Sequence, residues 1–185
     1  MNRLAPIILF TYNRPEHTQH TVEALIKNHL SKESDLIIYS DGARTPKQRQ
    51  KVDEVRKYLT TITEFHSVKL IHRSHNFGLA TSIIQGITEV LQQFERVIVL
   101  EDDMIISPYF LTYMNDALDQ FAENERVISI HGYVYPVQQE LPEAFFIPGA
   151  DCWGWATWRR GWEIFNSNGQ YLLDELTRQG LLRSF

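Results

Sequence analysis

Three consecutive acidic residues, Glu101, Asp102 and Asp103, directly follow residues 97–100, the clearest buried-strand pattern of the chain. Carboxylates beside a buried strand are costly unless a cation or hydrogen-bond donors compensate them. Hard divalent cations such as Mn²⁺ and Mg²⁺ prefer oxygen ligands, often one or two carboxylates together with substrate phosphates. The triplet therefore indicates a candidate cation site. The alternative is a solvated acidic turn before the helix that begins near Ser107.

Polar residues also follow the three earlier apolar runs, where strands are expected to end. They are Thr11, Tyr12, Asn13 and Arg14, then Asp41, then Arg73, His75 and Asn76, which precede Gly78. A carboxylate at Asp41 could accept an N–H from a base such as uracil, but Asp-Gly is equally a turn dipeptide. The third group could bring cationic donors to a diphosphate, with Gly78 allowing close backbone approach, or form an ordinary strand-to-helix turn. Neither a Walker loop nor a Gly-x-Gly-x-x-Gly motif occurs.

All four tryptophans lie within ten residues of one another, which suggests a wall for sugar rings. Three of them, Trp155, Trp158 and Trp162, have the i, i+3, i+7 spacing of a helix face packed on a core. Trp153, with Asp151 two residues before it, is the better candidate for sugar contact. Asp151 could instead cap the helix predicted for the tryptophans.

The elements that position these residues alternate between strand and helix. Apolar runs predict strands at 7–10, 36–39, 68–71, 97–100, 127–130 and 145–147, and helices are expected to begin at Pro15, at Thr45-Pro46 as a capping box, at Gly78 and at Ser107-Pro108. This alternation favours a single α/β domain whose mainly parallel sheet is covered by helices on both faces. Ligands of such sheets bind at the carboxyl ends of the strands, so the polar groups above should converge. Residues 170–185 read as an amphipathic helix, and we expect the chain to stop inside a longer protein.

Composition excludes several function classes. The chain has 185 residues and a net charge of -5, which makes nucleic acid an unlikely partner for its surface. It shows no apolar run long enough for a membrane span and no signal peptide. The single cysteine, Cys152, permits no internal disulfide and is most simply placed in the reducing cytoplasm.

The order of these motifs resembles that of glycosyltransferases of the family-2 type, which have the GT-A fold. The motifs are Thr-Tyr-Asn-Arg-Pro, Ser-Asp-Gly, Asn-Phe-Gly-Leu-Ala and Val-Ile-Val-Leu-Glu-Asp-Asp. The stretch from Glu101 to Phe110, followed by Phe-Ile-Pro-Gly at 146–149, is similar also to the N-acetylglucosaminyltransferase I group. The resemblance covers nearly the whole chain and rests on the ordered set.

The resemblance implies a nucleotide-sugar donor, most often a UDP-sugar, and a Mn²⁺ or Mg²⁺ cofactor. It places Asp41 at the uracil, Asp102 at the ribose or sugar and beside the metal, and Asp103 at the metal. The other donor-binding positions that it suggests, together with the two candidates near the tryptophans, are Thr11, Tyr12, Asn13, Arg14, Arg73, His75, Asn76, Gly78, Glu101, Asp151 and Trp153.

The reaction that the resemblance implies is inverting attack of an acceptor hydroxyl on the anomeric carbon, aided by a carboxylate base. The matching position for that base falls near or beyond Phe185, so we expect residues 1–103 to form the nucleotide-binding half and 104–185 the start of an incomplete acceptor half. The acceptor would be a glycan or lipid-linked sugar in surface polysaccharide or lipopolysaccharide synthesis, at the cytoplasmic face of the inner membrane with peripheral contact.

Two other function classes share such a sheet. A nucleotidyltransferase that makes NDP-sugars would have a glycine-rich, basic loop after the first strand, but the loop from Thr11 to Pro15 contains no glycine. A non-catalytic module that binds nucleotide sugars or glycans would carry the same motifs, and only turnover would distinguish it from a transferase.

Overall fold

The apolar runs of the sequence form six strands, which the computed structural model describes within residues 3–182. The strands are β1 (Ile7–Thr11), β2 (Asp35–Ser40), β3 (Ser67–His72), β4 (Arg96–Glu101), β5 (Ser129–His131) and β6 (Trp155–Trp158). The helices are α1 (Pro15–Ile26), α2 (Pro46–Leu59), α3 (Leu79–Leu91), α4 (Phe110–Gln120), α5 (Arg159–Trp162) and α6 (Gly169–Arg178), with a 3-10 turn, η1 (Ser31–Glu33).

The six strands pair in the order β3-β2-β1-β4-β6-β5, and the first four in this order are parallel. Strand β6 runs antiparallel to both of its neighbours. The register aligns Phe10 of β1 with Tyr39 of β2 and with Glu101 of β4, so these strands end at the same level. We call this side of the sheet, where β1 to β4 end, the carboxyl edge.

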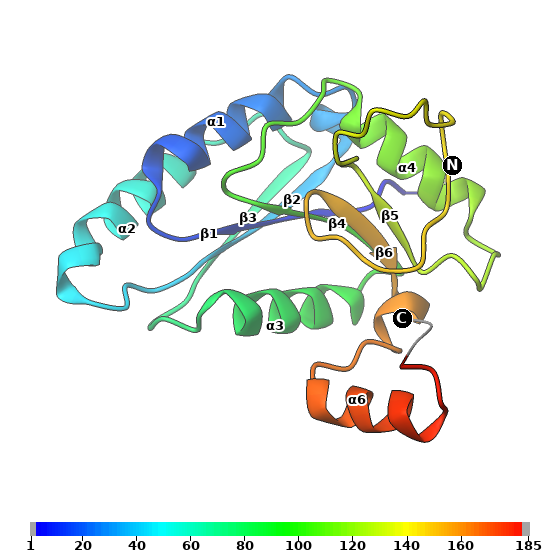
Figure 1. Cartoon of the computed structure of the whole chain (residues 1–185). Helices are drawn as coiled ribbons and strands as arrows, with labels where there is room; N and C mark the ends of the chain where they lie inside the picture. The colour runs from blue at the N-terminus through cyan, green and yellow to red at the C-terminus, as the bar shows by residue number, and fades with distance from the viewer. Residues whose placement is uncertain (1–2, 183–185) are drawn as a thin grey trace.

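Helices cover both faces of the sheet, as the sequence predicts (Figure 1). Successive residues of a strand point to opposite faces. Ile7 and Leu9 of β1 therefore pack in the core that includes α1, α2 and α4, while Ile8 and Phe10 pack in the core that includes α3. All five residues of β1 are buried, which explains the uniformly apolar sequence of this central strand.

Two predictions for the C-terminal third are wrong. Residues 145–147 are exposed and form no strand, because they lie on the long loop between β5 and β6. The sixth strand is instead Trp155–Trp158, where a helix was predicted from tryptophan spacing. The packing role of those tryptophans is nevertheless confirmed, since Trp158 is 6% exposed and Trp155 and Trp162 pack against the α3-side core.

The amphipathic pattern at 170–185 forms α6, which ends at Arg178; residues 183–185 lie outside the described part of the chain. None of the residues of α6 is buried, and the helix lies apart from the sheet (Figure 1). In the described residues, every helix is too short or too polar to cross a membrane.

Candidate functional site

The acidic triplet lies at the carboxyl edge, where β4 ends at Glu101 and the chain turns. Asp102 is only 2% exposed, and its carboxylate accepts hydrogen bonds from the Tyr12 backbone N–H at 3.2 Å and from the Thr18 hydroxyl at 3.4 Å. Asp103 is exposed. The loop after β1 is thereby joined to the loop after β4, as the topology requires of a shared site.

Arg14 bridges the two aspartates of this turn. One guanidinium nitrogen donates to Asp103 Oδ2 at 2.8 Å, and the other pairs with Asp102 Oδ1. Burial opposes the charged guanidinium, but the charges and hydrogen bonds of Asp102 and Asp103 outweigh burial and raise the pKa of Arg14. The two carboxylates therefore share one cationic partner in this structure.

The pKa values of two acidic groups at this edge are raised. Burial raises the pKa of Asp102, and the opposing effects of Arg14 and the Tyr12 N–H offset it only in part. Burial also raises the pKa of Glu101, and the charges of Asp103 and Asp102 add to the shift. Additional positive charge at this edge would favour the ionised forms of both groups.

Asp41 organises the loop after β3. Its Oδ1 accepts the backbone N–H groups of Gly42 and Phe77, at 2.9 and 2.8 Å. Its Oδ2 accepts the Asn76 side-chain amide at 2.9 Å and the Gly78 N–H at 3.0 Å. A carboxylate has about four acceptor positions, so those of Asp41 are all engaged within the protein. Its carboxylate fixes the turn at 76–78, a role that the sequence did not reveal.

Tyr12 connects the loop after β1 with the loop after β2. Its hydroxyl donates to Gln48 Oε1 at 2.9 Å and accepts the Arg44 backbone N–H at 3.1 Å. Gln48 therefore bonds to Tyr12 and to the Thr45 hydroxyl, and Thr45 makes no side-chain cap of the helix that begins at Pro46. The predicted capping box is thus wrong in its hydrogen bonds, although the helix begins where it was predicted.

Two further residues hold the loops after β2 and β3 together, and neither was predicted. One Arg56 nitrogen donates to the carbonyl oxygens of Ser40, Asp41 and Arg73, at 3.2, 3.2 and 2.8 Å. Gly42 lies so close to the loop after β3 that a Cβ atom would be 2.4 Å from the His75 carbonyl carbon. The Asp-Gly pair in the sequence could have indicated the close approach at Gly42. Nothing in the sequence of the helix around Arg56 indicates that its side chain binds both loops.

The remaining candidates for nucleotide binding differ in their surroundings. Thr11 is buried, and its hydroxyl donates to the Tyr39 carbonyl at 3.4 Å; Asn13 is half-buried.

The Arg73 guanidinium lies over the rings of Tyr39 and Phe77, with centroid distances of 4.9 and 4.7 Å. The ring of exposed His75 stacks on Phe77 with centroids 4.5 Å apart. Gly78 adopts φ +76 at the start of α3, a conformation that favours glycine.

Asp151 and Trp153 belong to a different part of the carboxyl edge. They lie on the loop between β5 and β6, and Asp151 Oδ1 accepts the Cys152 and Trp153 N–H groups at 2.6 and 3.2 Å. Asp151 therefore caps a local turn rather than a helix. The Trp153 ring contacts Tyr133 and Tyr135.

The donor set at the acidic triplet suits a hard cation that is shared with a substrate. In the described part of the chain, no three His, Cys, Asp or Glu side chains group closely enough to hold a metal ion by themselves. Asp102 and Asp103 offer carboxylate oxygens to one Arg14 guanidinium. Two carboxylates completed by phosphate oxygens and water are a usual environment for Mg²⁺, so the residues fit such an ion.

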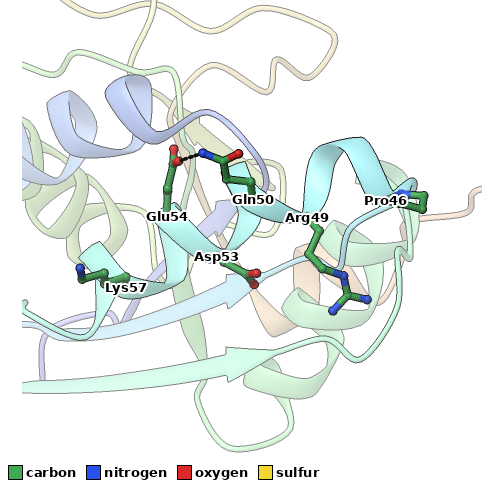
Figure 2. Close-up of a pocket in the computed structure, with 6 residues that line it drawn as sticks. All are labelled: Pro46, Arg49, Gln50, Asp53, Glu54 and Lys57. Carbon is green, nitrogen blue, oxygen red and sulfur yellow. Dashed lines mark hydrogen bonds between the residues drawn. The ribbon is translucent and has the colours of Figure 1, made fainter.

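A shallow hollow lies elsewhere, along the outer face of α2 (Figure 2). It is lined by exposed residues of that helix, two of which, Gln50 and Glu54, are joined by a hydrogen bond. Its lining residues are Pro46, Arg49, Gln50, Asp53, Glu54 and Lys57. None of them is a predicted site residue, so this hollow has no part in the candidate site.

The family model described as glycosyl transferase family 2 matches residues 7–166. No curated protein sequence matches the chain. Among solved structures, S. aureus TarS 1-349 is similar with a TM-score of 0.51 and 17% identity, over 83% of this chain and 47% of TarS 1-349.

Two other solved structures are similar with lower scores. A mannosyltransferase, PcManGT from Pyrobaculum calidifontis in complex with GDP-Man and Mn2+, has a TM-score of 0.49 and 16% identity, over 69% of this chain and 34% of that one. A 4-diphosphocytidyl-2C-methyl-D-erythritol synthase has a TM-score of 0.47 and 12% identity, over 96% of this chain and 86% of that one. The chain thus spans less than half the length of TarS 1-349 and of the mannosyltransferase. The family match covers most of the chain and agrees with the GT-A architecture seen here, so this chain belongs to glycosyl transferase family 2.

Proposed function

We propose that the chain binds a UDP-sugar together with Mn²⁺ or Mg²⁺ at the carboxyl edge and supplies the donor side of a glycosyl transfer. The observation that carries this proposal is the arrangement around Arg14, which bridges Asp102 and Asp103 where the loops after β1 and β4 meet. The arrangement stabilises positive charge, and the Arg14 side chain is 43% exposed, so ligands can approach it.

In this proposal Asp103 and Asp102 would hold the divalent cation. When bound, such an ion supplies positive charge that neutralises the departing diphosphate and orients it. Arg14 then exchanges its carboxylate partners for phosphate oxygens, because a guanidinium pairs in the same forked geometry with either group. Tyr12 stays in place during this exchange, since its N–H and hydroxyl hold it to Asp102 and Gln48.

The nucleotide would lie beside the loops after β1, β2 and β3, near Asp41, Asn76 and the stacked His75 and Phe77 rings. Contact between Asp41 and a uracil N–H would require one of the bonds that Asp41 makes to be exchanged. The Asn76 side-chain amide is the mobile partner of this set, because the other three donors are backbone N–H groups.

The wider function follows from the resemblance of the motifs. We propose an inverting transfer of the sugar to a glycan or lipid-linked acceptor, in surface polysaccharide or lipopolysaccharide synthesis at the cytoplasmic face of the inner membrane. Hexosyl or N-acetylhexosaminyl transfer would fit this role.

Isothermal titration calorimetry with UDP and with GDP, each with and without Mn²⁺, tests the proposal. We expect UDP to bind only in the presence of Mn²⁺, and Asp103→Ala to abolish this binding with the fold intact. Asp119→Ala is the matched control, because Asp119 is also a half-exposed aspartate paired with an arginine, Arg96. UDP binding that is independent of Mn²⁺, or that survives in Asp103→Ala, would refute the proposal.

A further inference from the structure

Three aromatic side chains gather on the loop between β5 and β6. The ring centroids of Tyr133 and Trp153 are 4.7 Å apart, those of Tyr133 and Tyr135 5.1 Å, and those of Tyr135 and Trp153 5.9 Å. Tyr135 is 57% exposed and Trp153 50% exposed. We call Tyr133, Tyr135 and Trp153 the aromatic cluster. Large aromatic surface exposed in one patch is typical of a binding site.

The strand register puts the aromatic cluster at the carboxyl edge, next to the acidic triplet. Val99 of β4 and His131 of β5 both pair with Trp155 of β6. Trp153 comes two residues before Trp155 and Tyr133 two residues after His131, so both lie just beyond the level of Val99, on the side where β4 ends at Glu101. The Gly132 N–H continues this pairing with a 2.8 Å bond to the Gly154 carbonyl.

Electrostatics agrees with this placement. Burial raises the pKa of Cys152, the residue before Trp153, and the negative charges of Glu101, Asp151 and Asp103 add to the shift. Two members of the acidic triplet therefore lie close enough to Cys152 to act on it.

Hydrogen bonds hold the aromatic cluster in place although the loop around it is open. Every residue from 132 to 150 is exposed. Asp151 nevertheless fixes the backbone before Trp153 by accepting two N–H groups, and the His131 Nδ1 atom accepts the Asp151 N–H at 3.3 Å. An aromatic surface that is ordered before binding loses little entropy when a ligand arrives.

We propose that the aromatic cluster binds a pyranose ring of the acceptor glycan. A pyranose presents C–H groups on its face and hydroxyl groups around its rim, so an aromatic face with a carboxylate beside it matches both parts. The Trp153 and tyrosine rings receive the C–H face, and Asp151 accepts a hydroxyl. This inference rests on the proposed function for the identity of the reaction.

The order of the strands assigns this surface to the acceptor rather than to the donor. The loops proposed to contact the nucleotide follow β3, β2 and β1, and the proposed cation ligands follow β4. The aromatic cluster comes next along the edge, beside β6 and β5. A donor laid out from base to diphosphate along this edge would end with its sugar near β4. An acceptor sugar on the aromatic cluster would then stand beside the donor sugar.

NMR with the whole chain tests the proposal, using methyl glycosides of glucose, galactose, mannose and N-acetylglucosamine as probes at millimolar concentration. We expect at least one glycoside to show saturation transfer to its ring C–H protons and to shift the Trp153 indole N–H signal. The indoles of Trp158 and Trp162 donate to Leu118 and Thr88, at 3.2 and 2.9 Å, so their signals serve as internal controls for folding.

Variants separate ring stacking from a general effect on the loop. Tyr133→Ala should weaken glycoside binding at least about fivefold, whereas Tyr133→Phe, which keeps the ring, should change it less than about twofold. Tyr171→Ala removes an exposed tyrosine from α6, away from the aromatic cluster, and should have no effect. Glycosides that leave the Trp153 signal unchanged, or a Tyr133→Ala variant that binds them normally, would overturn the proposal.

UDP with Mn²⁺, added to the same samples, distinguishes this proposal from the proposed function. We expect Trp153→Ala to keep its UDP affinity while losing the glycoside. Loss of UDP affinity in Trp153→Ala would assign the cluster to the donor and overturn the acceptor proposal. Failure of UDP to bind the unmodified chain would refute the proposed function, while glycoside binding at Trp153 would still support a carbohydrate site.

Discussion

Two buried carboxylates at opposite ends of the sheet are both paired with an arginine, but their environments shift their pKa values in opposite directions. Asp35 begins β2, and its carboxylate binds Arg3 at 2.6 Å, the His66 Nδ1 atom at 2.9 Å and the Ser67 hydroxyl. Burial acts to raise the pKa of Asp35, but the hydrogen bonds from Ser67, His66 and Arg3 prevail and lower it. At Asp102, burial prevails over Arg14 and Tyr12, and the pKa is raised.

The difference separates a structural carboxylate from one suited to bind a ligand. The fold stabilises ionised Asp35 with its own donors, so this end of the sheet gains nothing from a further cation. The fold leaves the charge of Asp102 less well compensated, and Asp103 and Glu101 add negative charge beside it. Active sites are the usual place for such incompletely compensated groups.

Removing Arg14 should have the largest effect on stability. Arg14→Ala leaves the charge of buried Asp102 without an opposite charge, which costs roughly 3–5 kcal/mol in buried pairs. Because Arg14 is partly exposed, water replaces part of the interaction, and we expect a loss of about 3 kcal/mol, the lower end of that range. Added Mn²⁺ should raise the melting temperature of Arg14→Ala more than that of the unmodified chain, since the ion would replace the lost charge.

Denaturant unfolding and thermal melting, with and without Mn²⁺, measure both effects. Arg178→Ala is the control, because Arg178 pairs with Glu175 on the exposed surface of α6, where water and salt screen the pair, and its removal should leave the stability nearly unchanged. An Arg14→Ala variant with unchanged stability would show that Asp102 does not depend on this partner.

Asp41 tests how much a carboxylate of the carboxyl edge also contributes to the stability of the fold. Asp41→Ala removes the acceptor of three backbone N–H groups and of the Asn76 amide, and we expect it to cost about 2 kcal/mol, because the half-buried donors at 76–78 regain some water. Hydrogen exchange should become faster at the Phe77 and Gly78 amides and stay unchanged in β4. Unchanged exchange at these two amides would contradict the role assigned to Asp41.

Asp35→Ala should have a smaller effect. Its partners Arg3 and His66 are 69% and 65% exposed in their side chains, so water replaces Asp35 readily and the expected loss is about 1 kcal/mol. Calorimetry should give an unchanged UDP affinity in the presence of Mn²⁺. Weaker UDP binding by Asp35→Ala would remove the distinction between the two ends of the sheet.

The pH dependence of stability gives the smallest effect. Because the pKa of Asp35 is lowered from 3.8 in the folded chain, ionised Asp35 stabilises the fold above that pH, and the contribution is lost as the pH falls through the folded pKa. Between about pH 5 and about pH 2, the unmodified chain should therefore lose more free energy of unfolding than Asp35→Asn. Urea unfolding of the two proteins measures this pH dependence. Free energies of unfolding that change equally with pH in both would show that ionised Asp35 does not stabilise the fold.

The fold could be predicted from the sequence where a strand is buried on both faces. The runs at 7–10, 36–39 and 97–100 are continuous, apolar and bounded by turn residues, and each became a strand. The segment Trp155–Trp158 could not be assigned in this way, because four residues do not distinguish a strand from a helix. Its tryptophans pack as predicted, since either element would bury them.

The candidate site could be predicted as a set of loops, because the ends of parallel strands meet at one edge. The individual contacts could not be predicted. The bridge from Arg14 to Asp102 and Asp103 depends on how far the loops after β1 and β4 extend beyond the sheet. Arg14 and Asp102 are 88 residues apart in the sequence. Two of the donors that occupy the acceptor positions of Asp41 lie on the turn after β3, far from Asp41 in the sequence. The helix pattern around Arg56 likewise gave no sign that this residue ties two loops together.

Electron paramagnetic resonance of Mn²⁺ is the most direct test of the account. Free aqueous Mn²⁺ gives a strong six-line signal that weakens when the ion binds the protein. With UDP present, the unmodified chain and Asp35→Ala should both deplete this signal, whereas Asp103→Ala should leave it about as strong as UDP alone does. Equal depletion of the signal by Asp103→Ala and by the unmodified chain would show that the acidic turn after β4 does not hold the cation, and would contradict the account.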